Sequence, residues 1–146
     1  MDHPVTKIDI RSEGDIVSVR QAVRKECARI GFGLTDVTRI VTAASELARN
    51  VFRYAGQGTV YMTSALRDVV PGVELKFSDQ GPGIPDVDAA MTMGFSTRKG
   101  LGLGLPGARR LMDDMVVTSQ VGVGTTVIIR KWLTPLPAAA RSGGRR

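Results

Sequence analysis

Two long stretches with helical hydrophobic spacing follow each other in this chain of 146 residues, and they limit the folds that it can adopt. Between residues 16 and 30, and again between 37 and 51, apolar side chains return every three or four positions, which is typical of one buried helix face. Glycines end both stretches, at Gly31 and Gly33 and then at Gly56 and Gly58. The pattern predicts two long amphipathic helices in the first half of the chain.

Strand-like runs stand on both sides of these helices. One run precedes them, and the last two runs are joined through Gly122 and Gly124 as a hairpin. The predicted strands are 5–11, 59–66, 73–77, 115–121 and 125–132. Periodicity is weak over 80–104, so we expect a long functional loop there, with one helical turn near 87–91 and a short helix over 106–114.

The length and composition indicate one domain followed by a tail. A chain of this size can bury a single core, so residues 1–133 are predicted to form one domain. Residues 134–146 contain Pro, Ala, Gly, Ser and Arg and are predicted to be a disordered basic tail. The three arginines of this tail supply half of the formal net charge of +6, so the charge is a weak argument for nucleic-acid binding.

The cysteine count and the apolar runs bear on the cellular compartment of the protein. Cys27 stands alone, so the chain cannot form an internal disulfide, and its place on a helical apolar stripe predicts a core position. No apolar run approaches the roughly 20 residues of a membrane span. We therefore expect a soluble cytoplasmic protein with neither nucleic acid nor membrane as a partner.

Glu46 and Asn50 lie one helical turn apart on the second predicted helix. Side chains at i and i+4 emerge on one face, with Cβ atoms roughly 6 Å apart. Asparagine is a mediocre helix residue, so in mid-helix it suggests a contact, and its carbonyl oxygen suits Mg²⁺. Glu46 would then be placed to accept a proton from an attacking hydroxyl. Taken alone, the pair fits a solvated helix face better.

A second polar segment follows the strand predicted over 73–77. Asp79 has the parity of the core-facing row, so its carboxylate points at the floor of a pocket and needs hydrogen-bond donors. A carboxylate can accept from the exocyclic amine of adenine, where guanine carries a carbonyl, and Gly81 and Gly83 let a ring approach the backbone. An ordinary Gly-Pro-Gly turn explains this segment equally well when it is taken alone.

The third segment is a glycine-rich loop over 100–104, just before a predicted helix. The free N–H groups of a helix start can hold phosphate, and residues 96–99 add hydroxyl donors and positive charge. Residues 102–107 also fit the glycine pattern of a dinucleotide-binding unit. We reject that match, because no buried strand precedes it and no acid follows about twenty residues further on.

In this order the three segments resemble the nucleotide-binding boxes of the GHKL ATPases, the superfamily of gyrase and the histidine kinases. Residues 46–50 resemble the N box, 79–83 the first glycine box, 100–104 the second, and 124–126 the late threonine motif near adenine. The resemblance covers about residues 5 to 133. Within the superfamily the sequence is similar to the anti-sigma-factor serine kinases, and among them to the RsbT-type switch kinases of bacterial stressosomes. That narrower resemblance is carried by residues 45–50, 54–56, 79–85, 94–97, 104–107 and 110–113.

The resemblance implies a fold and a set of site residues. The fold is of the α+β class, a two-layer α/β sandwich of the Bergerat type with a mixed sheet covered by helices on one face. Asn50 would bind Mg²⁺, Asp79 would bind the adenine of ATP, and Glu46 would accept the proton of the substrate hydroxyl. The glycine-rich loop would be the ATP lid. The predicted catalytic residues are Glu46, Arg98 and Lys99, the last two to offset charge on the transferred group. The predicted nucleotide-binding residues are Asn50, Arg53, Asp79, Gly81, Gly83, Ser96, Thr97, Gly100, Leu101, Gly102, Leu103, Gly104 and Thr125.

The resemblance also implies an activity and partners. Such kinases phosphorylate serine or threonine on STAS-domain antagonist proteins and, once released, activate a PP2C-type phosphatase. An alternative within the same fold is an anti-sigma factor that sequesters a sigma subunit. A detached catalytic domain of a histidine kinase is disfavoured, because we see no dimerising phosphoacceptor segment and the one histidine, His3, is terminal.

Overall fold

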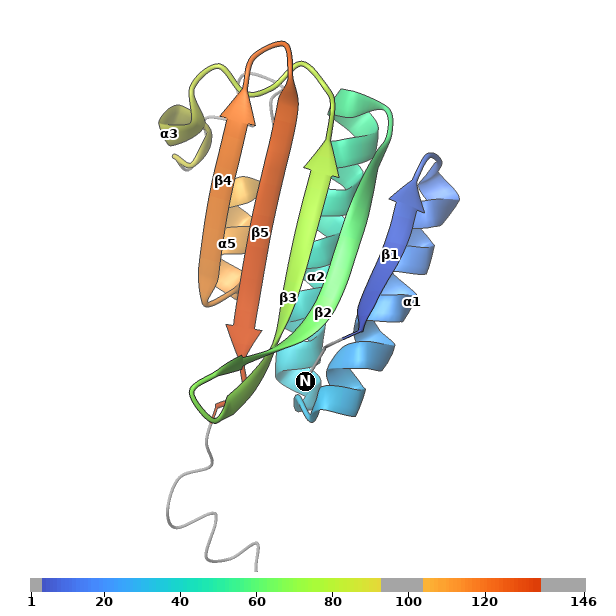
Figure 1. Cartoon of the computed structure of the whole chain (residues 1–146), viewed down its shortest axis with the longest axis vertical. Helices are drawn as coiled ribbons and strands as arrows, with labels where there is room; N and C mark the ends of the chain where they lie inside the picture. The colour runs from blue at the N-terminus through green and yellow to red at the C-terminus, as the bar shows by residue number, and fades with distance from the viewer. Residues whose placement is uncertain (1–3, 93–103, 135–146) are drawn as a thin grey trace, which may run out of the picture.

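The structure, a computed structural model, describes residues 4–92 and 104–134 and shows two layers. One layer is a sheet, and α1, α2 and α5 cover a single face of it (Figure 1). The strands are β1 (Val5–Ile10), β2 (Gly58–Arg67), β3 (Val70–Asp79), β4 (Asp114–Gln120) and β5 (Gly124–Trp132). The helices are α1 (Glu13–Ile30), α2 (Leu34–Asn50), the short α3 (Val87–Ala90) and α5 (Leu105–Leu111), and a π-helical turn, η1 (Val51–Ala55), follows α2.

The described strands form one sheet in the order β1-β2-β3-β5-β4, in which each neighbouring pair is antiparallel. The expected two-layer α+β fold is confirmed, but the expected mixed sheet is wrong. Two helices separate β1 from β2, so the chain returns to the end of the sheet that it left and β2 runs antiparallel to β1. The pairs β2–β3 and β4–β5 are hairpins, which are antiparallel by construction. The crossover through α5 does make β4 run parallel to β3, but β5 lies between them.

The core fills the space between the sheet and the helices. The sheet contributes alternate residues of its strands, whose side chains point toward the helices. Among them, Leu75 of β3 and Ile129 of β5 are fully buried. Its helix side includes Val23 and Cys27 of α1, which also have no exposed surface, so the predicted core position of Cys27 is confirmed. Burial, and to a lesser extent the Glu26 carboxylate, raise the pKa of the Cys27 thiol to about 12.

Two helix ends differ from the sequence prediction. The second helix was expected to continue to the glycines at 56 and 58, but at Val51 it changes into the π-helical turn, which ends before Gly56. The helix predicted over 106–114 already ends at Leu111. Its early end follows from the sheet, because the N–H of Asp113 donates to the carbonyl of Arg130 at 3.0 Å and the chain has by then begun to pair with β5.

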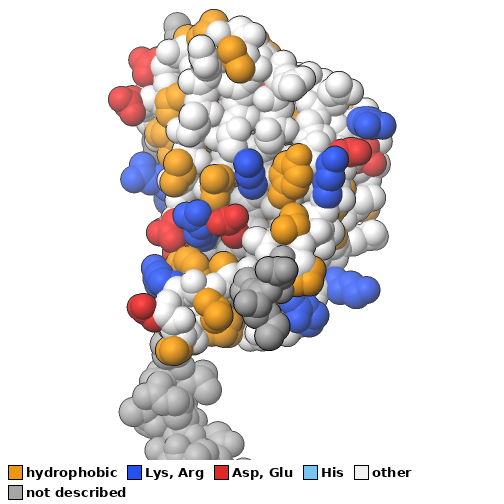
Figure 2. All heavy atoms as spheres, viewed as in Figure 1, with side chains coloured by type: hydrophobic (Ala, Val, Ile, Leu, Met, Phe, Trp, Pro, Cys, Tyr) orange, Lys and Arg blue, Asp and Glu red, His pale blue; other side chains and the backbone are white. Residues whose placement is uncertain are grey.

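Among the described residues, no helix covers the other face of the sheet (Figure 1), and this face mixes charged with apolar side chains (Figure 2). Across β3 and β5, Arg130 Nε donates to Glu74 Oε1 at 2.8 Å. Lys76 Nζ lies 5.7 Å from the centre of the Tyr61 ring. Within residues 4–92 and 104–134, no helix combines the length and the apolar character needed to cross a membrane.

Candidate functional site

A pocket opens between α2 and the sheet, at the end where β3 stops and β5 starts. The space between its walls, counted out to the open mouth, is about 680 Å³. Its walls are mostly apolar and come from segments far apart in the chain. Apolar lining residues include Leu47, Phe77, Ile84, Pro85, Leu105 and Val127. Such walls suit a flat, largely apolar ring system.

Asp79 is the acid of this pocket, and it stands at the last position of β3. Its Oδ1 accepts the N–H of Gly81 at 2.9 Å and the N–H of Thr125 at 3.3 Å. The donors that the sequence parity demanded are therefore present. A carboxylate offers about four acceptor sites, so Asp79 retains capacity to accept a further hydrogen bond from a ligand.

Asn50, the last residue of α2, lines the same pocket. Its Nδ2 atom is buried and has no hydrogen-bond partner among the described residues. Buried polar atoms are almost always bonded in native proteins, so an unpartnered amide nitrogen beside a pocket fits a role in holding a polar ligand. It argues against the solvated helix face, which the sequence had left open for this residue.

Glu46 lies one turn before Asn50 on α2, outside the pocket lining. Its side chain is 44% exposed, and its Oε2 lies 3.7 Å from a guanidinium nitrogen of Arg49. Gly104, the residue that precedes α5, packs directly on it, since a Cβ built there would lie 3.3 Å from Glu46 Oε2. The structure thus brings the carboxylate against the last residue of the predicted lid.

The π-helical turn forms the pocket wall beyond Asn50 and packs on two glycines. A Cβ at Gly58 would lie 2.5 Å from Val51 Cγ1, and a Cβ at Gly81 would lie 2.6 Å from the Cβ of Ala55. Single π-turns are frequently found at functional sites. Here the wider turn, which contributes Tyr54 and Ala55 to the lining, sits close to the sheet only because both facing residues lack side chains.

The loop after Asp79 is fixed to the turn between β4 and β5. Gly83 has φ +81°, and a Cβ there would lie 2.5 Å from the carbonyl oxygen of Gln120. The N–H of Gly122 donates to the carbonyl of Pro82 at 2.9 Å. The N–H of Ile84 donates to Ser119 Oγ at 2.7 Å. The glycines at 81 and 83 are therefore required by packing within the protein, a reason that the sequence did not reveal.

Apart from Glu46, the predicted site residues divide into three groups. Asn50, Asp79, Gly83 and Thr125 line the pocket, while Gly81 donates to Asp79 and Gly104 contacts Glu46. Arg53 is exposed on η1 and is not among the lining residues. The rest lie outside the described residues: Ser96, Thr97, Arg98, Lys99, Gly100, Leu101, Gly102 and Leu103.

Sequence reasoning missed the apolar walls and Ser119. Leu47 and Phe77 were expected in the core, and their role as pocket walls depends on the space left beside them. For Ser119 a signal existed: it shares the strand parity of Met115 and Val117, which pack on the core. A polar residue with core-facing parity needs hydrogen-bond partners inside the fold, which is the argument that identified Asp79 on β3.

Comparison with known sequences identifies relatives over most of the chain. A family model described as a histidine kinase-like ATPase domain matches residues 11–131. The serine/threonine-protein kinase RsbT of Bacillus subtilis (strain 168) is 46% identical over 126 residues, which cover 86% of this chain and 95% of RsbT. An anti-sigma F factor of Bacillus licheniformis is 32% identical over 122 residues, 79% of this chain and 82% of that protein.

Solved structures share the fold at low sequence identity. The structure of the RsbU and RsbW domains of Rv1364c from Mycobacterium tuberculosis aligns with a TM-score of 0.62 at 20% identity, over 90% of this chain and 33% of that longer chain. The catalytic domain of the histidine kinase ThkA aligns with a TM-score of 0.51 at 19% identity, over 92% of this chain and 98% of that chain. At such identities the likeness concerns the fold alone.

Proposed function

Because this chain belongs to the histidine kinase-like ATPase family and is a protein serine/threonine kinase that uses ATP, we propose that it is a partner switch that phosphorylates STAS-domain antagonist proteins. Once released from such a protein, it activates a PP2C-type phosphatase in a cytoplasmic stress pathway that controls a sigma factor. Support comes from the identity to RsbT over nearly the whole of that relative. The structural observation that carries the proposal is the pocket that Asn50 and Asp79 both line.

In this proposal the pocket holds the adenine end of ATP. Apolar walls such as Ile84 and Val127 exclude water from the purine ring, and the Asp79 carboxylate accepts from its exocyclic amine. The carbonyl oxygen of the Asn50 carboxamide suits Mg²⁺, which takes few protein ligands and fills its shell with water and phosphate oxygens. The Nδ2 of the same group, unpartnered among the described residues, is free to donate to a phosphate oxygen. Bound there, Mg²⁺ would neutralise charge on the phosphates.

Glu46 performs the proton transfer in this proposal. Its carboxylate takes the proton of the substrate hydroxyl, whose oxygen forms a bond to the γ-phosphorus of ATP. The bond from that phosphorus to the bridging oxygen breaks, and its electron pair leaves with ADP. A half-exposed carboxylate is accessible to a hydroxyl on another protein, and Arg98 and Lys99 are assigned to offset charge on the transferred group.

Transfer of a labelled phosphoryl group tests the proposal directly. The full chain is incubated with γ-labelled ATP, Mg²⁺ and purified STAS proteins encoded near its gene. Label on a serine or threonine of one STAS protein is expected, and its loss when that residue is replaced by alanine is the control. Label found only in inorganic phosphate would reduce the activity to simple hydrolysis and contradict the proposal.

A second candidate is an anti-sigma factor, favoured by the 32% identity to the anti-sigma F factor. The same ATP site would serve a protein that binds and sequesters a sigma subunit. Parallel pull-downs with purified sigma factors, STAS proteins and PP2C-type phosphatases separate the two candidates. Retention of a sigma factor without retention of the other partners would favour the second candidate.

A further inference from the structure

The Ser119 hydroxyl lies where three segments of the pocket meet. It accepts the N–H of Ile84 at 2.7 Å, and it lies 2.8 Å from Thr125 Oγ1 and 3.2 Å from the carbonyl oxygen of Gly124. Ser119 and Thr125 are direct partners in the β4–β5 ladder, and the N–H of Thr125 donates in turn to Asp79 Oδ1. One hydroxyl therefore connects the loop after Asp79 with the strand that holds Asp79 in place.

The Ser119 hydroxyl has two possible acceptors for its single hydrogen. Ser119 has one hydrogen, which it donates either to the Gly124 carbonyl or to Thr125 Oγ1. In the second arrangement the bonds run in one direction, from the Ile84 N–H through Ser119 to Thr125. The hydrogen of Thr125 is then available to a ligand in the pocket that Thr125 lines. Hydrogen bonds that follow one another in this way polarise each other and strengthen the last donor.

We propose that Ser119 is a positioning residue for the nucleotide, which orients the Thr125 hydroxyl to donate into the pocket beside the accepting carboxylate of Asp79. A donor and an acceptor side by side match adenine, whose exocyclic amine donates and whose adjacent ring nitrogen accepts. Ser119 also fixes Ile84, one of the apolar walls, through the bond to its N–H. This inference rests on the proposed binding of ATP in the pocket.

The effect should appear in nucleotide binding and not in the chemical step, because Ser119 acts through Thr125 and Ile84 and is not assigned to the reacting atoms. One neutral hydrogen bond corresponds to a change in affinity of about two- to twelvefold. Replacement of Ser119 by alanine should therefore raise the Kd and the KM for ATP by about that factor. The kcat should stay within about twofold of wild type.

The experiment measures ATP binding by calorimetry, and phosphoryl transfer, for S119A, T125V and the double variant. Ser119→Cys keeps the volume with a weak donor and provides the same comparison if S119A does not fold. Thr118→Ala is the matched control, since Thr118 is the exposed neighbour on β4 and points to the other face of the sheet. If Ser119 acts through Thr125, the Kd of the double variant for ATP should be only slightly higher than that of the single variant with the higher Kd.

Two results would overturn the inference while leaving the proposed function intact. One is an ATP affinity of S119A equal to that of wild type. The other is a loss of affinity in the double variant equal to the product of the fold-losses of S119A and T125V. Failure of the wild-type chain to bind ATP would instead contradict the proposed function. Thermal unfolding of each variant without nucleotide supplies the remaining readout. A fall in the melting temperature with unchanged affinity would assign Ser119 to stability alone.

Discussion

The two ends of the β4–β5 hairpin treat polar side chains in opposite ways. At the end far from the pocket, Lys131 is only 8% exposed, and its Nζ donates to the carbonyl of Leu111 at 3.0 Å. The same ammonium lies 3.6 Å from Asp113 and 4.0 Å from Asp36. It thereby joins the end of α5 to the first turn of α2, and its charge is matched within the protein.

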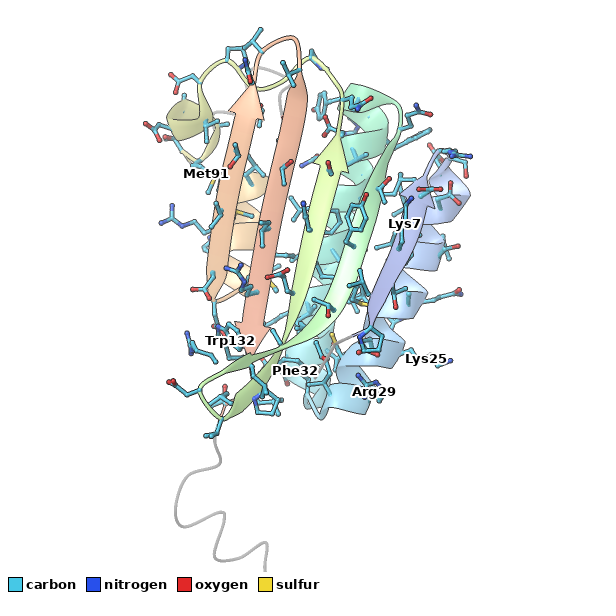
Figure 3. The ribbon with its side chains drawn as sticks, viewed as in Figure 1. Lys7, Lys25, Arg29, Phe32, Met91 and Trp132 are labelled. Atoms are coloured by element: carbon cyan, nitrogen blue, oxygen red, sulfur yellow. The ribbon has the colours of Figure 1, made fainter. Side chains whose placement is uncertain are left out.

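Trp132 completes this far end, at the foot of β5 in Figure 3. Its backbone N–H donates to Asp113 at 2.9 Å and its Nε1 donates to Asp114 at 3.0 Å. The guanidinium of Arg67 lies 4.8 Å from the centre of its ring, and the ring packs on Gly72, where a Cβ would come within 2.4 Å. Each of these polar groups finds a partner within the fold.

At the pocket end the polar groups retain capacity for a ligand. Asn50 Nδ2 is buried without a partner among the described residues, and Asp79 uses one oxygen for two backbone donors. Burial of polar groups therefore has a different meaning at each end. Satisfied groups stabilise the fold, whereas spare capacity indicates binding, so substitutions at the two ends should change different measurements.

The largest effect is expected for Glu46→Gln, which removes the proposed base. Phosphoryl transfer should fall by about 10²- to 10⁴-fold, the usual contribution of a general base. The Kd for ATP should not change, because Glu46 lies outside the pocket lining. Single-turnover transfer and calorimetry measure the two quantities, with the exposed Glu13→Gln as control. Equal transfer by E46Q and wild type would contradict the assignment.

The next effect is expected for Asp79→Asn. The new carboxamide oxygen can still accept from Gly81 and Thr125, so the melting temperature should change little. The charge and one acceptor oxygen are lost, and charge-assisted bonds of this kind correspond to about a 10- to 100-fold loss of ATP affinity. Calorimetry on D79N, with the exposed Asp88→Asn as control, checks both statements. Unchanged affinity would remove Asp79 from the adenine site.

At the far end, Lys131→Met should have the opposite profile. It removes the bond to the Leu111 carbonyl and leaves Asp113 and Asp36 without this ammonium, so the free energy of unfolding should fall by about 1–3 kcal/mol. Denaturant unfolding measures this loss, and ATP affinity of the folded variant should equal that of wild type. If affinity fell while stability did not, the contrast between the two ends would be wrong.

The smallest effect concerns acid pH and the pair Glu26 and Arg29 on α1. Arg29 Nε donates to Glu26 Oε1 at 2.9 Å, and this bond holds the pKa of Glu26 below its ordinary value. Its contribution to stability is therefore present above the ordinary pKa of a glutamate and is lost as pH falls through the lower pKa of the folded state. Because Arg29 is largely exposed and water screens the pair, this contribution should be small.

Unfolding of Glu26→Gln across pH 7 to 3 checks this sign. The stability difference from wild type should be constant near neutrality and should shrink in acid, and Arg29→Gln should show the same trend. A difference that grew in acid would contradict the assigned direction. Neither variant should change ATP affinity, since neither residue lines the pocket.

The sequence by itself determined the elements and the most informative residue of the site. Helical spacing located α1 and most of α2, and strand parity placed Asp79 at a pocket floor in need of donors. Both inferences depend only on neighbours within a few positions along the chain, where the geometry of a helix or strand is fixed. The two-layer fold was predicted from the resemblance of the three polar and glycine-rich segments to the GHKL ATPases.

Tertiary structure alone decided the antiparallel pairing, the π-helical turn against Gly58 and Gly81, and the meeting of Ser119 with Ile84 and Thr125. These features depend on which distant segments become neighbours and how closely their backbones approach. Local patterns in the sequence carry no record of those distances, because they are set by the packing of the whole sheet against its helices.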